Sequence, residues 1–196
     1  MGLFDSLLGR TKQIQPNLDS LFALPSAAVT ISMQAGLVTS HHAGVCWKPP
    51  SGQAPADVQR EVTELLDLND RDPSTPSLRS MEDDLGFRWL LVDGENLEDL
   101  VTNVHQVNTL LNEQGWGPQL LCSVFGFVPG ESADSSARKS FLVYLYKQGT
   151  FYPFCPTSSD RRDNEAEIRL AATIGSDLPM EPDLSRWMAL WDLPVS

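Results

Sequence analysis

The sequence has few cysteines and few basic residues for its length. Its 196 residues include three cysteines, and 14 lysines and arginines stand against 26 aspartates and glutamates, so the formal net charge is −12. Three widely spaced cysteines without a CxxC pair make a poor disulfide framework and indicate a reducing compartment. A chain this acidic repels phosphate backbones, so we expect no binding to nucleic acid.

Long apolar runs and catalytic motifs are also lacking. No apolar stretch approaches the ~18 residues that a membrane span needs, and the first residues, interrupted by Asp5, have no signal-peptide cleavage site. The sequence contains no HExxH motif, no zinc-binding Cys–His spacing, no phosphate-binding loop and no GxSxG elbow. With 41% hydrophobic residues, the chain can still build a core. We therefore expect a cytoplasmic, acidic globular protein without a cofactor.

Residues 1–16 are the first of two expected parts, a short amphipathic leader. Its apolar side chains fall on one side of a helix: Leu3, Phe4, Leu7 and Leu8. Arg10 and Lys12 follow at the helix end, where the helix dipole favours positive charge. So short a helix is not stable alone in water, so the leader is expected to contact its own domain, a protein partner or, weakly, a membrane surface. The four apolar side chains and Arg10 are therefore the candidate partner or membrane contacts.

Residues 17–196 are the second part, in which hydrophobic periodicity and turn residues predict alternating helices and strands. The first half is expected to contain a helix between Asn17 and Pro25, a strand over 29–33, turns at Gly36 and Gly44, a strand over 45–47, a helix over 55–66 and an acidic, mobile surface loop over 69–84.

The second half gives the stronger patterns. It is expected to contain a strand over 87–92, a helix capped by Asn96 and ended by Gly115, strands over 119–128, 141–147 and 151–154, a polar loop over 130–139, a helix over 163–174 and a tail over 180–195 that covers the remaining surface. The helices lie between runs of antiparallel strands, so the fold class is α+β: a single domain with an antiparallel sheet packed against helices.

Candidate chemistry is sparse. A thiol nucleophile needs an adjacent base, and Cys122 and Cys155 look instead like small buried hydrophobic residues. His41 and His42 point to opposite faces of a strand and cannot jointly bind one metal without a turn there, and His105 lies beside the apolar stripe of a helix. We therefore expect no catalytic and no metal-binding residue.

Arg161 and Arg162 lie where a strand unit enters a helix, which Asp163 or Asn164 would cap. Paired arginines can hold a carboxylate or a phosphate, but a structural salt bridge is the simpler interpretation.

Several stretches together resemble one family. They are MGLFDSLLGR at 1–10, LFALPSAAVT at 21–30, GPQLLCS at 117–123, LVYLYKQGTFYPF at 142–154, RRDN at 161–164 and LPMEPDL at 178–184. The sequence is similar over nearly its whole length to the PspA-associated protein PspAB family of the bacterial phage-shock, or envelope-stress, system.

The resemblance implies a genomic context and does not imply a mechanism. Such proteins are typically encoded beside PspA, a companion called PspAA and an HtpX-type membrane protease, and the resemblance supplies no catalytic residue. Its shared residues Tyr146, Lys147, Arg161 and Arg162 are either a family surface or part of the fold.

The resulting hypothesis is a non-enzymatic adaptor of the phage-shock response that binds a protein partner at the cytoplasmic face of the membrane. One alternative is a small ligand-binding protein or enzyme that uses Cys122, Cys155 or the arginine pair. Another is a secretion-chaperone-like protein-binding module, which the order of elements suggests. The sequence does not predict the oligomeric state.

Overall fold

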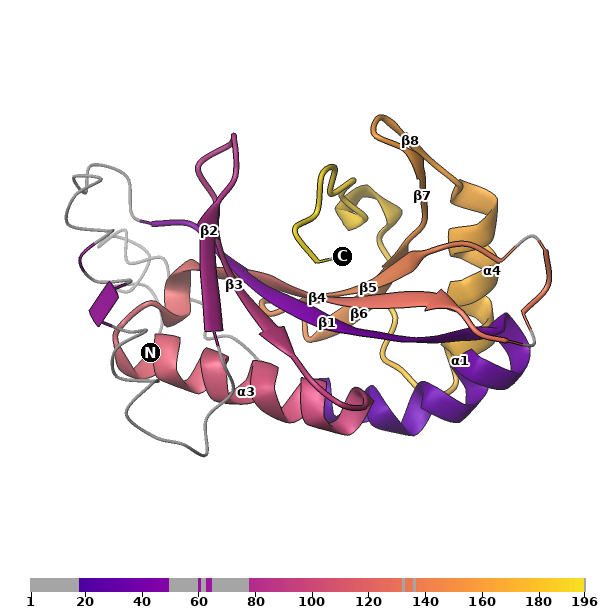
Figure 1. Ribbon diagram of the computed structural model, residues 1–196, viewed down its shortest axis with the longest axis horizontal. Coiled ribbons are helices and arrows are strands. Elements are labelled where there is room, and N and C mark those ends of the chain that lie inside the picture. Colours follow the sequence, from indigo (N-terminus) through magenta and orange to yellow (C-terminus); the bar gives the residue numbers. More distant parts are fainter. Residues whose placement is uncertain are drawn as a thin grey trace, which may run out of the picture.

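A six-stranded antiparallel sheet forms the centre of the protein in the computed structural model (Figure 1). The structure describes residues 18–49, 60, 63–64, 78–131, 133–135 and 137–195. In chain order the strands are β1 (Leu37–Trp47), β2 (Leu78–Glu82), β3 (Arg88–Asp93), β4 (Leu120–Pro129), β5 (Ser140–Leu145) and β6 (Thr150–Phe154). Across the sheet their order is β2-β3-β1-β4-β5-β6, and each neighbouring pair is antiparallel. The α+β class is confirmed.

The long helix α3 (Leu97–Glu113) covers one face of the sheet (Figure 1). Asn96 caps it, since Asn96 Oδ1 accepts a 2.9 Å hydrogen bond from the Asp99 N–H. Its buried residues form one stripe: Leu97, Leu100, Val101, Val104, Val107, Asn108 and Leu111. The predicted helix and its cap are therefore confirmed.

The segment before β1 is helical, which corrects two predictions. It consists of the 3-10 turns η2 (Asp19–Ala23) and η3 (Pro25–Ala27) and the helix α1 (Ala28–Ala35). Pro25 begins a helical turn instead of ending one, because proline fits the first position of a helix.

The strand predicted over 29–33 is wrong, because these residues lie within α1. Ile31 is buried, but Val29 and Met33 are 66% and 82% exposed, so the alternation in sequence does not reflect alternating burial. Gly36 ends α1 at φ 65°, a left-handed conformation that glycine adopts freely, and β1 follows at once.

The turn predicted at Gly44 is also wrong, because Gly44 lies inside β1 and pairs with Leu91 on one side and Val124 on the other. The irregular part of β1 comes earlier, between Thr39 and Ala43, where the register with β4 shifts and His41 has a φ of 67°. The predicted strand over 45–47 is therefore the end of a much longer one.

The loop predicted over 69–84 is wrong over residues 78–82, which form β2 and pair with β3. Residues 69–77, the leader 1–16 and most of the helix predicted over 55–66 lie outside the described residues, although Arg60, Thr63 and Glu64 are helical.

The second half follows the prediction closely. Four residues, 146–149, join β5 to β6, and both faces of β5 are buried. A short ribbon of β7 (Pro156–Ser158) and β8 (Arg161–Arg162) precedes α4 (Asn164–Ile174). Asp163 caps α4, because its Oδ1 accepts a 2.9 Å hydrogen bond from the Ala166 N–H, and α4 contacts both β6 and α1.

Residues 180–195, here called the C-terminal strap, cover the sheet face opposite α3 (yellow in Figure 1). The strap contains the short turn η5 (Leu184–Arg186) and ends at Val195, which is 1% exposed. Val195 lies directly over Gly44, where an added Cβ would come within 2.9 Å of Val195 Cγ2. The absence of a side chain at Gly44 therefore makes room for the end of the strap.

Candidate functional site

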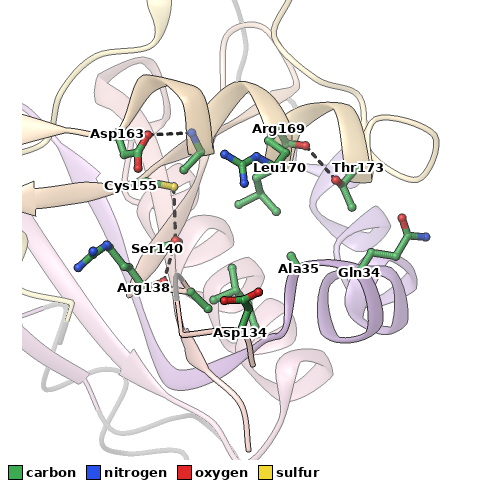
Figure 2. Close-up of a pocket in the computed structure, with 13 residues that line it drawn as sticks. Gln34, Ala35, Asp134, Arg138, Ser140, Cys155, Asp163, Arg169, Leu170 and Thr173 are labelled. Carbon is green, nitrogen blue, oxygen red and sulfur yellow. Dashed lines mark hydrogen bonds between the residues drawn. The ribbon is translucent and has the colours of Figure 1, made fainter. Parts of the chain in front are cut away.

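The clearest hollow in the described part of the protein lies between α1, α4 and the loop before β5 (Figure 2). Its volume is about 270 Å³, slightly below the usual size of a small-molecule site. The lining residues are Gln34, Ala35, Leu37, Asp134, Ala137, Arg138, Ser140, Cys155, Asp163, Ala166, Arg169, Leu170 and Thr173. The order of elements brings these residues together from three separate parts of the chain.

Cys155 is the one thiol among the residues that line this hollow. Its Sγ donates a 3.4 Å hydrogen bond to Ser140 Oγ, which in turn donates a 3.0 Å bond to the Arg138 carbonyl, as the dashed lines of Figure 2 show. Burial raises the pKa of the Cys155 thiol to about 11. A thiol in this state is almost entirely protonated near pH 7, so it lacks the activation that a nucleophilic cysteine needs.

The other polar groups around the hollow have structural contacts. Asp163 caps α4, and Thr173 Oγ1 donates a 2.9 Å bond to the Arg169 carbonyl. The Arg169 guanidinium forms an exposed ion pair with Glu165. Arg138 is exposed at the rim. The arrangement can hold a small polar or anionic molecule, but it does not pair a nucleophile with a base.

Arg162 is held inside the protein. Its guanidinium forms a nearly buried ion pair with Glu167, whose carboxylate also accepts a 2.9 Å bond from the Cys155 N–H. Arg162 Nη1 donates a further 2.7 Å bond to the Trp187 carbonyl of the strap, and the guanidinium lies 5.2 Å from the centre of the Phe154 ring. These contacts give Arg162 the structural salt-bridge role and leave it unsuited to an external anion.

Tyr146 is also part of the core. Its side chain is fully buried, and its hydroxyl donates a 2.6 Å hydrogen bond to Asn108 Oδ1 and bonds Ser123 Oγ. Burial raises the pKa of Tyr146 well above its usual value. The bond explains why a polar residue, Asn108, stands in the apolar stripe of α3.

Of the four residues shared with the family, Lys147 and Arg161 are exposed. Lys147 precedes β6 in the hairpin turn, whereas Arg161 follows the far end of β6. The five residues of that strand span roughly 16 Å, so the fold separates the two cations. A family surface that used both would have to be extended.

The histidines do not form a metal site. His41 Nδ1 bonds the Gly94 carbonyl at 3.1 Å, His42 Nδ1 bonds Asp93 Oδ1 at 2.7 Å, and His105 contacts the Phe22 ring. In the ranges that the structure describes, no three histidine, cysteine, aspartate or glutamate side chains group so as to hold a metal ion.

Cys122 lies on β4 directly opposite Cys46 of β1, under the strap. No local pattern predicts this pair, because the two cysteines are far apart in the chain and the strand predicted over 45–47 covers only the end of β1.

An exposed apolar face is also not predicted from the sequence, because the alternation over 29–33 indicates a strand where the structure has α1. Phe22, Val29 and Met33 are 49%, 66% and 82% exposed. Val29 and Met33 lie four residues apart and therefore on one side of α1. We call these three residues the α1 stripe.

The anchor of the strap is Glu181, a third feature that the sequence did not reveal. Its buried carboxylate accepts hydrogen bonds from Thr150 Oγ1 at 2.7 Å, the Asp183 N–H at 3.0 Å and Arg186 at 3.1 Å. Burial alone would raise the pKa of Glu181, but these donors hold it below its ordinary value. The strap is thus fixed by polar contacts as well as by packing.

None of the helices in the described part of the chain has the length and apolar character that crossing a bilayer requires. Compared with known proteins, the chain matches the family model PspAB, described as PspA associated protein B, over residues 1–195. No curated protein and no solved structure matches it.

Proposed function

The chain belongs to the PspAB family of PspA associated proteins, and on that premise we propose that it is a non-enzymatic adaptor of the phage-shock membrane-stress response. In this proposal it binds a protein partner, first of all PspA, at the cytoplasmic face of the membrane. PspAA and an HtpX-type protease are further partners to test.

The observation that carries the proposal is the α1 stripe. Large apolar side chains that are more than half exposed, such as Val29 and Met33, gain free energy when a partner covers them, about 25 cal/mol for each Å² removed from water. Phe22 extends the stripe, and its ring already contacts His105 of α3 at a centroid distance of 4.9 Å. A partner helix laid along α1 could therefore contact an ordered apolar surface.

The state of the polar residues supports an adaptor over an enzyme. The Cys155 thiol is neutral, and Tyr146 and Arg162 are hydrogen-bonded within the core. The ring nitrogens of His41 and His42 bond a backbone carbonyl and a carboxylate, and neither bonds a thiol or a hydroxyl that it could activate as a base.

Binding of purified PspA to the full chain, measured by biolayer interferometry, tests the proposal. The variant Val29→Asp/Met33→Asp should weaken binding at least tenfold, because each aspartate would be desolvated in the interface. The matched control is Leu85→Asp, which changes an equally exposed leucine, 74% accessible, in the turn between β2 and β3. Absence of binding by the unaltered chain, or equal binding by both variants, contradicts the proposal.

The leader has a separate role in the proposal, as a weak contact to the partner or the membrane. Deletion of residues 1–12 should reduce the fraction of protein that sediments with membranes or with PspA, while the melting temperature of the remaining domain stays the same. Unchanged sedimentation would remove this role from Leu3, Phe4, Leu7, Leu8 and Arg10.

The hollow between α1 and α4 supports a second candidate, a small-ligand-binding function. Arg138 and Arg169 at its wall suit a carboxylate or phosphate ligand. A screen of small anions by thermal shift should then raise the melting temperature of the wild type. The variant Arg138→Gln/Arg169→Gln should lose the shift, and a flat screen removes this candidate.

A further inference from the structure

Cys46 and Cys122 face each other across the two central strands of the sheet. They are direct partners in the antiparallel ladder of β1 and β4, and both side chains belong to the core beneath the strap. Residues opposite each other in such a ladder have Cα atoms about 4.5 or 5.5 Å apart. Both separations lie within the ~4.4–6.8 Å that a disulfide can bridge without backbone movement.

The two thiols already interact. A hydrogen bond with Cys122 and then burial hold the pKa of Cys46 well above its usual range. Both cysteines are free, and their residues are only 4% and 6% exposed. Both side chains are therefore shielded from solvent, and the Cys46 thiol keeps its proton at neutral pH.

The shield is the C-terminal strap. Trp187, Leu190 and Leu193 pack against the same core as the two cysteines, and Val195 is buried within it. Met180 bridges to Phe151 of β6, but residues 182–195 pair with no strand, so this part of the strap can leave the sheet without breaking the β1–β4 ladder.

We propose that Cys46 and Cys122 are a thiol–disulfide modification site, which closes between β1 and β4 when the strap loosens in the presence of a small-molecule disulfide. This inference is independent of the adaptor function. Its consequence is a sheet whose two longest strands are covalently joined.

The chemistry takes two exchange steps. One cysteine loses its proton, and its thiolate attacks a sulfur of the small disulfide, which forms a mixed disulfide and releases one thiolate. The second cysteine then loses its proton and attacks the protein sulfur of the mixed disulfide, which releases the second thiolate. Two electrons pass from the protein to the oxidant, and the two protons convert the released thiolates into thiols.

Closure should be measurable as a gain in stability. A crosslink between residues 46 and 122 closes a long loop in the unfolded chain, and for a domain of this size it should raise the melting temperature by roughly 10 °C.

The test is incubation of the folded full chain with oxidised glutathione at pH 8, followed by intact-mass and peptide mass spectrometry. We expect the loss of two hydrogen atoms and a crosslinked peptide pair that contains Cys46 and Cys122. Cys155→Ser should behave in the same way, whereas Cys46→Ser should stop at a glutathione adduct or remain unmodified. The variant Val195→Asp, which loosens the strap, should accelerate closure at least tenfold.

Two results overturn the proposal. One is a stable glutathione adduct on either cysteine of the wild type without closure. The other is full retention of both thiols in the wild type, heated to 10 °C below its melting temperature, under conditions that oxidise a model dithiol peptide. The wild-type experiment decides the question even if Val195→Asp does not fold.

Discussion

Arg162 and Glu167 form an ion pair in which Arg162 Nε lies 2.9 Å from both carboxylate oxygens of Glu167 and Nη2 lies 2.7 Å from Oε2. The glutamate is 2% exposed. Through the further bonds to the Cys155 N–H and the Trp187 carbonyl, this pair joins the end of β6, the helix α4 and the strap. It is the polar centre of the carboxy-terminal half.

The variant Glu167→Gln should therefore lower the free energy of unfolding by about 3–5 kcal/mol, because it leaves the Arg162 charge without its partner. The matched control is Glu165→Gln on the same helix, whose exposed pair with Arg169 is worth well under ~1 kcal/mol. Urea unfolding measures both. Equal effects of the two substitutions would contradict the assigned role.

The hydroxyl of Tyr146 should contribute about 1–3 kcal/mol to the free energy of unfolding, since Tyr146→Phe leaves buried groups of Asn108 and Ser123 without their partner. The double variant Tyr146→Phe/Asn108→Leu should recover part of the loss, because it removes a buried polar group along with its donor. If the double variant loses as much as the sum of the single variants, the two residues are not coupled.

The buried thiol of Cys155 should lower the free energy of unfolding at alkaline pH. An unfolded thiol loses its proton near pH 9.0, whereas burial raises the pKa of Cys155 in the folded protein to about 11. Between these values the unfolded chain holds fewer protons, so the free energy of unfolding falls as the pH rises, by at most ~1.4 kcal/mol per pH unit. Urea midpoints at pH 8, 9 and 10 should fall less steeply for Cys155→Ala, and equal slopes would contradict the prediction.

Gly44→Ala should destabilise the protein by about 1–3 kcal/mol, because the new methyl group would clash with Val195. Val195→Ala should also destabilise it, through lost burial. The two changes together should cost less than their sum, and hydrogen exchange of residues 184–195 should show a looser strap in each single variant. Strict additivity in a double-mutant cycle would show that the two residues do not meet.

The parts of the fold that could be predicted are those with long local patterns. α3 has a cap and a seven-residue stripe, and β4, β5 and β6 are apolar runs separated by clear turns. The segment 29–33 could not be assigned correctly, because an alternating apolar pattern of five residues also fits a short helix whose exposed side carries Val29 and Met33. The strand predicted over 45–47 covers only the end of β1, because the sequence does not show whether a glycine such as Gly44 lies in a strand or in a turn.

The candidate sites could be predicted less well, because they depend on contacts between distant segments. The interpretation of Arg162 as a structural residue is confirmed, but its partner Glu167 and the strap carbonyl beyond it were not foreseen. The pairing of Cys46 with Cys122 follows from strand register, which no local pattern specifies. Tyr146 is buried and not on a surface, because its hydroxyl donates a hydrogen bond to Asn108 of α3.

The position of the strap after every strand that it covers has a consequence for biosynthesis. The sheet is complete once Phe154 has been made, but the face that includes Trp89 and Phe141 stays uncovered until Val195 leaves the ribosome. At about 5–20 residues per second, translation of the intervening ~40 residues takes roughly 2–8 s. During that time the nascent chain presents an apolar sheet to solvent, so chaperones that hold emerging polypeptides have a defined interval in which to bind it.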